Sequence, residues 1–278
     1  MRTVRLPGGR EVPALGQGSW WMGEKPENSI PEANALRLGI DLGLTLIDTA
    51  EMYADGGAER VVGQAIAGRR DRVFLVSKVY PHNASRAGVA QACEASLQRL
   101  GTDRIDLYLL HWRGSVPLAE TVSGFERLHR DGKIGAWGVS NFDSDDLTEL
   151  ALVPGGGACA ANQVLYNPQH RGIEFDLLPW CAARGMAVMA YSPVGQGRSL
   201  MQATSLAAVA ARHDATVAQI AIAWGLRQPG LLSIPKAANP AHVRQNAAAA
   251  EIALTATDLA EIDAEFPPPT RKLPLAML

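Results

Sequence analysis

The sequence is poor in the residues that build disulfide frameworks and metal centres. It contains three cysteines and six histidines in 278 residues. Cys93, Cys159 and Cys181 lie far apart, and neither they nor the histidines follow the spacing of metal ligands. We therefore expect no disulfide framework and no bound metal, and the chain suits a reducing compartment.

Long apolar runs are also missing. No segment approaches the roughly 18 apolar residues of a membrane-spanning helix, and the first residues, MRTVRLPGGREVP, contain no apolar signal core. The formal net charge is -2, which favours neither nucleic acid nor an anionic membrane as a partner. The expected setting is the cytoplasm, and the expected partner is a small molecule.

What the sequence does contain is a regular alternation of strand-like and helix-like segments, after a predicted hairpin at Thr3–Pro13. Eight short runs are apolar or rich in β-branched residues: Ala14–Trp20, Thr45–Thr49, Val73–Val79, Ile105–Trp112, Ala136–Asn141, Ala160–Leu165, Ala187–Ser192 and Leu231–Lys236. The amphipathic segments are Pro31–Leu42, Ala58–Ala67, Ala87–Leu100, Leu118–Arg130, Asp143–Leu150, Ile173–Ala183, Ser205–Arg227, Pro240–Ala250 and Asp258–Phe266.

This alternation predicts an α/β fold, a single (β/α)8 TIM barrel over residues 1–278 with an N-terminal β-hairpin and two extra helices. Ser205–Arg227 leaves room for two helices, broken near His213. Pro240–Ala250 and Asp258–Phe266 are expected to close the barrel and to pack outside it. A doubly wound sheet is the alternative, but no GxGxxG sequence follows the first strand.

Polar residues collect at the ends of the predicted strands, where a barrel of this kind builds its active site. They are Asp48 with Tyr53 just beyond it, Lys78, His111, Ser140 and Asn141, Gln163, Tyr191 and Ser192, and Lys236. Taken alone, His111 and Gln163 fit a purely structural role better. Taken together, so many polar groups at one end of a barrel are costly unless they share a function.

Four of these residues suit proton transfer to a carbonyl group. Tyr53 is the candidate proton donor, although a tyrosine pKa near 10 is high for transfer at neutral pH. An ammonium group from Lys78 is expected to lower that pKa. Asp48 is expected to pair with Lys78, and His111 to orient a carbonyl oxygen.

Reduction of a carbonyl also needs a hydride source, and the remaining polar residues suit a nicotinamide dinucleotide. Tyr191 is placed to stack on a flat ring, while Ser140, Asn141 and Gln163 are suited to hold a carboxamide. Lys236, followed by a helix start at Asn239, suits a phosphate. Trp20, Trp21 and Trp112 are expected to line an apolar substrate pocket.

At these residues the chain resembles the aldo/keto reductases, most closely the small bacterial members of the methylglyoxal-reductase type. The motifs that carry the resemblance are IDTAEMY, VSKV, LYLLHW, GVSNF, NQVLYN, YSP and IPKA, in the order and at the spacing of the family. The resemblance implies NAD(P)H-dependent reduction of small aldehydes and ketones to alcohols. It implies the catalytic residues Asp48, Tyr53, Lys78 and His111, and cofactor contacts from Ser140, Asn141, Gln163, Tyr191, Ser192, Lys236, Asn239, His242 and Asn246.

Two features depart from the family pattern. After Lys236 the family often has a serine and, six positions after the lysine, an arginine that hold the 2'-phosphate of NADPH, whereas this chain has Ala237 and His242. NADPH is still the first choice of cofactor, with NADH possible. The segments after the fourth and seventh strands and the tail after Phe266 are short, which favours an open site.

Two other functions are compatible with the same barrel. Lys78 or Lys236 could act as a Schiff-base lysine, but that role leaves Tyr53, Gln163 and Tyr191 without a shared task. A non-catalytic regulatory protein that binds a dinucleotide is the second alternative. The oligomeric state expected from the family and from the absence of an exposed apolar stripe is a monomer.

Overall fold

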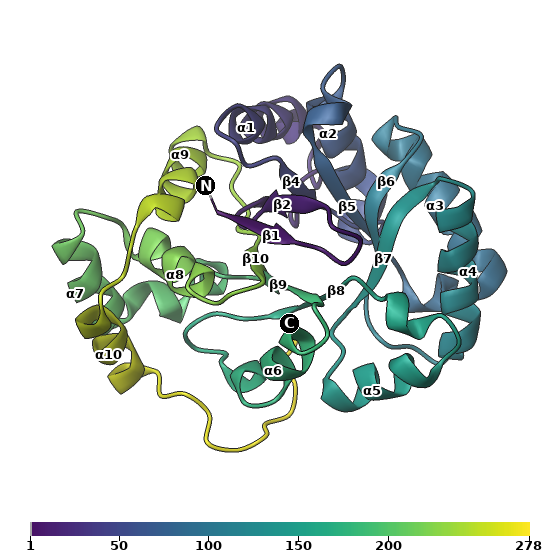
Figure 1. Cartoon of the computed structure of the whole chain (residues 1–278). Coiled ribbons are helices and arrows are strands. Elements are labelled where there is room, and N and C mark those ends of the chain that lie inside the picture. The colour runs from purple at the N-terminus through teal and green to yellow at the C-terminus, as the bar shows by residue number, and fades with distance from the viewer. Residues whose placement is uncertain (1) are drawn as a thin grey trace.

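The computed structural model describes residues 2–278, and its centre is a barrel of eight parallel strands (Figure 1). The strands are β3 (Gln17–Gly18), β4 (Leu46–Asp48), β5 (Phe74–Val79), β6 (Ile105–Leu110), β7 (Ile134–Ser140), β8 (Ala161–Leu165), β9 (Ala187–Tyr191) and β10 (Leu231–Ser233). Each strand pairs with the next one in the chain. Parallel bridges from Leu15 to Ser233 and from Gly18 to Lys236 join the first strand to the last. The predicted (β/α)8 barrel is confirmed.

The two strands that meet at this closure are shorter than the sequence predicts. Their backbones approach closely, and the Gly16 N–H donates to the carbonyl oxygen of Ser233 over 2.8 Å. A Cβ atom at Gly16 would lie 2.6 Å from the side chain of Leu46, and one at Gly18 would lie 2.9 Å from the carbonyl oxygen of Ile234. Glycine is therefore required on both sides of Gln17 for the barrel to close.

Helices surround the barrel: α1 (Ser29–Asp41), α2 (Gly57–Ile66), α3 (Arg86–Leu100), α4 (Leu118–Arg130), α5 (Ser144–Leu152), α6 (Leu177–Ala182), α7 (Thr204–Arg212), α8 (Val217–Leu226), α9 (Pro240–Ala248) and α10 (Ala256–Glu265). The predicted pair of helices between the last two strands is present as α7 and α8. Among residues 2–278, no helix is long and apolar enough to cross a membrane.

The identity of the two extra helices differs from the prediction. The helix α9 follows the last strand and packs against α1 and α8, so it completes the ring of barrel helices. The helix α10 packs instead against α7, outside that ring. The extra pair is therefore α7 and α10, which are brought together by a contact between distant parts of the sequence.

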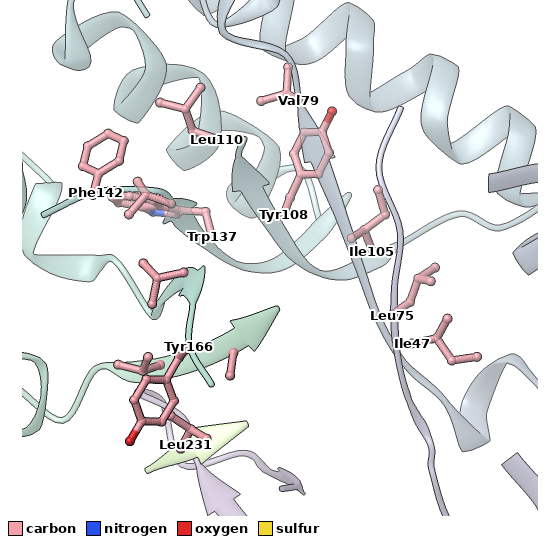
Figure 2. Packing of buried hydrophobic residues seen from close by; sticks show 14 of the residues in the cluster. Ile47, Leu75, Val79, Ile105, Tyr108, Leu110, Trp137, Phe142, Tyr166 and Leu231 are labelled. Carbon is pink, nitrogen blue, oxygen red and sulfur yellow. The ribbon is translucent and has the colours of Figure 1, made fainter. Parts of the chain in front are cut away.

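Outward-facing side chains of the strands pack against the helices in the largest apolar cluster of the molecule (Figure 2). Tyr108 of β6 and Trp137 of β7 both pack on Phe125 of α4, with ring centroids 5.8 and 5.5 Å apart. Burial of these large aromatic surfaces is a main source of stability for such a shell.

The N-terminal hairpin covers the amino ends of the strands. Its arms, β1 (Thr3–Arg5) and β2 (Glu11–Pro13), pair antiparallel and lie across the middle of the barrel in Figure 1. Val4 and Val12 join a second apolar cluster with Phe74 and Leu107 from inside the barrel. This end of the barrel is closed, so a ligand has to enter from the carboxyl ends of the strands.

One buried carboxylate attaches the hairpin to the barrel. Asp106 is 3% exposed at the start of β6 and accepts hydrogen bonds from Arg10, next to β2, and from Arg70 Nη2 over 2.8 Å. The Leu75 N–H donates to the same carboxylate over 2.8 Å. Asp106 thus accepts hydrogen bonds from three groups. It lies at the amino ends of the strands, opposite the carboxyl ends where the polar residues collect.

We expect Asp106→Asn to lower the free energy of unfolding by about 3 kcal/mol, because it leaves the mostly buried Arg70 guanidinium and the buried Leu75 N–H facing a neutral amide. The measurement is urea denaturation. A matched control is Glu11→Gln, which removes an exposed ion pair with Arg5 and should leave the midpoint nearly unchanged. Equal midpoints for the two variants would show that Asp106 does not secure the hairpin.

Candidate active site

The carboxyl ends of the strands open into a cavity of about 940 Å³. Most of the predicted site residues line it: Trp20, Trp21, Asp48, Tyr53, His111, Trp112, Ser140, Asn141, Gln163, Tyr191, Ser192, Lys236, His242 and Asn246. Lys78 lies directly beneath, fully buried, in contact with two of these residues. The barrel has brought together residues that span nearly 230 positions of the sequence, because parallel strands all end at the same rim.

A buried lysine is the hub of the site. Lys78 Nζ donates to Asp48 Oδ2 over 2.7 Å, to the carbonyl oxygen of Thr49 over 2.8 Å and to the hydroxyl of Tyr53 over 3.1 Å. An ammonium group has three hydrogens, and all three are used. Because the Tyr53 hydroxyl accepts from Lys78, its own hydrogen is free to point into the cavity. A fully committed, charged lysine also excludes the Schiff-base role for Lys78.

The turn after β4 places Tyr53 above this lysine. The residues that follow, Ala54, Asp55 and Gly56, all have positive φ angles, at 51°, 48° and 79°. Side chains other than glycine adopt this region at a cost of about 1 kcal/mol or more each. The turn reverses the chain within four residues and delivers it to α2, which holds Tyr53 at the cavity edge.

Burial raises the pKa of Tyr53, and the Lys78 ammonium group opposes this rise without cancelling it. Lys78 thus has the expected effect on the pKa of Tyr53, but burial raises that pKa by more, so the expectation of a net lowering is wrong. The reason is that a phenolate in the cavity loses the solvation it has in water. Tyr53 is a neutral phenol at neutral pH, which is the form that can donate a proton.

The pKa values of Asp48 and Lys78 are each set by burial and by the charge of the other residue. Burial favours the neutral amine of Lys78, but the charge of Asp48 and the hydrogen bonds outweigh it and raise the pKa of Lys78. Burial raises the pKa of Asp48, while Lys78 and Gln163 oppose that rise. Lys78 stays charged because its partners are 2.7 to 3.1 Å away.

His111 contributes an uncharged imidazole. Burial, helped by the nearby charge of Lys78, lowers the pKa of His111 to about 2. Its ring meets the Tyr53 ring edge-on, with centroids 5.7 Å apart. The Nδ1 atom is enclosed and has no hydrogen-bond partner among residues 2–278, so Nε2 is the nitrogen left for a ligand. His111 can orient a carbonyl oxygen as a neutral donor.

The residues predicted to hold a carboxamide form a connected group. The Asn141 Nδ2 donates to the carbonyl oxygen of His111 over 3.1 Å, and the Tyr191 hydroxyl donates to Asn141 Oδ1 over 3.0 Å. The Ser140 hydroxyl donates to the carbonyl oxygen of Gln163 over 2.8 Å. Asn141 has a φ angle of 60°, so the chain turns sharply where β7 ends. The group is held in place before any ligand binds.

Two basic side chains line the same cavity. Lys236 and His242 are both exposed, and neither forms a salt bridge within residues 2–278. Asn246 and Gln245 line the cavity as well. These side chains suit the phosphate groups of a dinucleotide.

Asn239 has a different place from the one predicted. Its side chain does not line the cavity, because Oδ1 accepts a hydrogen bond from the Ala241 N–H over 2.8 Å and caps the first turn of α9. The cap fixes the start of the helix that carries His242. Oδ1 is thus used by the helix cap, and a contact of the exposed Nδ2 with the cofactor stays a prediction.

The tyrosine end of the cavity has an aromatic wall. Trp20 and Trp21 stack with centroids 5.2 Å apart, and Trp20 lies 6.5 Å from the Tyr53 ring. On the other side Trp112 lies 5.0 Å from the ring of His111. All three tryptophans line the cavity, and their contact with a substrate stays a prediction.

Sequence reasoning missed several apolar residues that line the cavity. They are Met52, Met201, Val217, Met277 and Leu278. The last two come from the C-terminal tail, which runs from α10 past α6 (Figure 1). A salt bridge of 2.8 Å from Lys272 to Asp145 holds the tail on α5. The tail was expected to leave the site open; instead, it returns to the cavity, and no local pattern in the sequence signals this.

The donor groups fit a nicotinamide dinucleotide and not a metal. Among residues 2–278, no cluster of histidine, cysteine or acidic side chains could hold a metal ion. The cavity instead offers a preformed polar group beside Tyr191, an aromatic wall beside Tyr53, and two exposed basic side chains. These match the flat amide-bearing ring and the phosphates of such a cofactor.

Comparison with known proteins gives the same answer as the geometry. Residues 14–265 match the aldo/keto reductase family. Methylglyoxal reductase YeaE from Escherichia coli (strain K12) is 52% identical, over 100% of this chain and 99% of that protein. Glyoxal reductase from Bacillus subtilis (strain 168) is 34% identical, over 94% of this chain and 92% of that protein.

A solved structure is also very similar. The aldo-keto reductase from Klebsiella pneumoniae in complex with NADPH is 54% identical, with a TM-score of 0.98 over 100% of this chain and 99% of that one. The resemblance inferred from the motifs is confirmed. The barrel, the buried lysine beneath a tyrosine and these matches together show that the chain is an oxidoreductase and belongs to the aldo/keto reductase family.

Proposed function

We propose that this protein reduces small aldehydes and ketones to alcohols with NADPH, and that Tyr53 is the general acid. The observation that carries the proposal is the Tyr53 hydroxyl, which accepts from Lys78 over 3.1 Å and so directs its own proton into the cavity. The Klebsiella pneumoniae relative that was solved in complex with NADPH supports the choice of cofactor.

The side chains divide the reaction between them. When bound, the nicotinamide supplies the hydride. His111 orients the carbonyl oxygen as a neutral donor, and Tyr53 transfers its proton to that oxygen. The Lys78 ammonium group stabilises the phenolate as it forms, since the opposite charge lies 3.1 Å away. Asp48 keeps Lys78 charged and fixed in position.

The proposed substrates are methylglyoxal-like dicarbonyls and aromatic aldehydes. The names of the Escherichia coli and Bacillus subtilis relatives point to the dicarbonyls. The stacked Trp20 and Trp21 and the ring of Trp112 suit an aromatic aldehyde. Because the relatives are named reductases, turnover is favoured over the regulatory alternative. A cytoplasmic monomer remains part of the proposal.

We expect Tyr53→Phe to reduce turnover by about 10²-fold to 10⁴-fold, because it removes the proton donor. The dissociation constant of NADPH should stay within about twofold, since the ring and its packing remain. Turnover is followed by the absorbance of NADPH with methylglyoxal and with a nitrobenzaldehyde. Reduction at the wild-type rate would exclude Tyr53 as the acid.

We expect Lys78→Met to abolish turnover and to lower the free energy of unfolding by about 3 kcal/mol at neutral pH, because Asp48 is left buried and unpaired. An unpaired buried carboxylate binds a proton more readily than an unfolded one, so the deficit should shrink as the pH falls. The control is Asp48→Asn combined with Lys78→Met, which has no unpaired charge and should recover part of the stability. A double variant no more stable than Lys78→Met would contradict this account.

We expect His242→Glu to weaken the binding of NADPH by about fivefold to tenfold and to leave the binding of NADH nearly unchanged, because a carboxylate at this position repels the 2'-phosphate that only NADPH carries. The dissociation constants are measured by quenching of tryptophan fluorescence. His242→Gln, which introduces no charge, serves as the control. Equal losses of affinity for the two dinucleotides would remove His242 from the phosphate site.

A further inference from the structure

A hydrogen bond crosses the barrel beneath the cavity and joins opposite walls. Gln163 lies on β8 and Asp48 on β4, and three strands separate them in either direction around the barrel. The Gln163 Nε2 donates to Asp48 Oδ1 over 2.7 Å. Both residues are 2% exposed, so the contact is shielded from water. A buried polar contact of this kind is costly unless every group in it is satisfied.

Asp48 dictates which end of the Gln163 amide faces the cavity. An ionised carboxylate can only accept hydrogen bonds, so the NH₂ end has to point at Asp48. The Oε1 atom therefore points away from it, and it has no donor among residues 2–278. Gln163 lines the cavity. It presents an acceptor, and not a donor, to whatever binds beside it.

The same contact extends the chain of hydrogen bonds that ends at the proton donor. Asp48 Oδ2 accepts from Lys78, and Lys78 donates to Tyr53. Each oxygen of Asp48 thus has one donor, from Gln163 on one side and from Lys78 on the other. Loss of the Gln163 donor leaves Oδ1 buried and unpaired, and the pKa of Asp48, already raised by burial, rises further.

We propose that Gln163 is a positioning residue that couples the carboxamide of the bound cofactor to the proton-donating chain. Its amide oxygen accepts from the carboxamide nitrogen, while its amide nitrogen holds Asp48 and, through it, Lys78 and Tyr53. The inference rests on the proposed function, because the nicotinamide brings the N–H donor. Coupling of this kind is reciprocal, so Asp48 also sets the preference of the site for that donor.

The test compares two ligands that differ only at this group. NADP⁺ carries a carboxamide, and its 3-acetylpyridine analogue has a methyl group in place of the NH₂. Dissociation constants are measured by quenching of tryptophan fluorescence, which needs no turnover. Wild type should bind NADP⁺ roughly tenfold more tightly than the analogue, the effect of one buried hydrogen bond. In Gln163→Met, a side chain of similar length without an acceptor oxygen, the ratio should fall to less than about threefold, with any remainder due to Ser140 and Asn141.

The decisive variant is Asp48→Asn. In Asp48→Asn the amide oxygen has to accept from Lys78, so the NH₂ faces Gln163 and favours the opposite orientation of the Gln163 amide. The ratio should therefore fall to less than about threefold, although Gln163 itself is unchanged. A wild-type ratio in Asp48→Asn would overturn the coupling and leave Gln163 as a simple contact. Because Gln163 is intact, this variant is informative even if Gln163→Met does not fold.

The matched control is Gln17→Met. Gln17 is also buried, at 4% exposure, and its Nε2 donates to the carbonyl oxygens of Leu36 and Leu44, away from the cavity. This variant should keep the wild-type ratio. Equal binding of both ligands by wild type would overturn the inference and leave the proposed function standing. No binding of NADP⁺ by wild type would overturn both.

Discussion

The structure of the site depends on one buried ion pair, between Asp48 and Lys78. Two charges that are almost fully enclosed lose their hydration, and their attraction repays that loss only if the remaining hydrogen-bonding capacity is also satisfied. Lys78 therefore needs three acceptors, and it finds them in Asp48, the Thr49 carbonyl and Tyr53. The Tyr53 hydroxyl is therefore held in place because buried Lys78 needs it as an acceptor. The same hydrogen bond orients the Tyr53 proton towards the cavity.

The barrel makes this pair possible because alternate side chains of a strand face opposite sides. Lys78 points inward to Asp48, whereas its neighbour Ser77 points outward and donates to Glu59 of α2 over 2.6 Å. The hairpin seals the amino ends of the strands with apolar side chains. Water and ligands reach the interior only from the carboxyl ends, where the ion pair meets the cavity. The closed end supplies stability, and the open end carries the chemistry.

The cavity combines side chains of different chemistry. Trp20 stacks on Trp21 and lies beside Tyr53, and Lys236 and His242 add two exposed basic side chains. Asn141 and Tyr191 add a polar group that is already joined by a hydrogen bond of 3.0 Å. A ligand that carries both a flat ring and phosphates therefore finds suitable partners for each part in one cavity.

The barrel, and the polar residues that meet at its open end, could be predicted from the sequence alone. Apolar runs at intervals of about 30 residues predict βα units, and polar residues at the strand ends are recognisable because they interrupt those runs.

Other features depend on contacts between distant segments and are visible only in the tertiary structure. The pairing of α7 with α10 and the return of Met277 to the cavity have no local signal. The direction of the pKa shift of Tyr53 depends on how much water burial removes, and the orientation of the Gln163 amide depends on a carboxylate across the barrel. Local sequence encodes periodicity and residue type, whereas desolvation and long-range hydrogen bonds exist only once the chain has closed on itself.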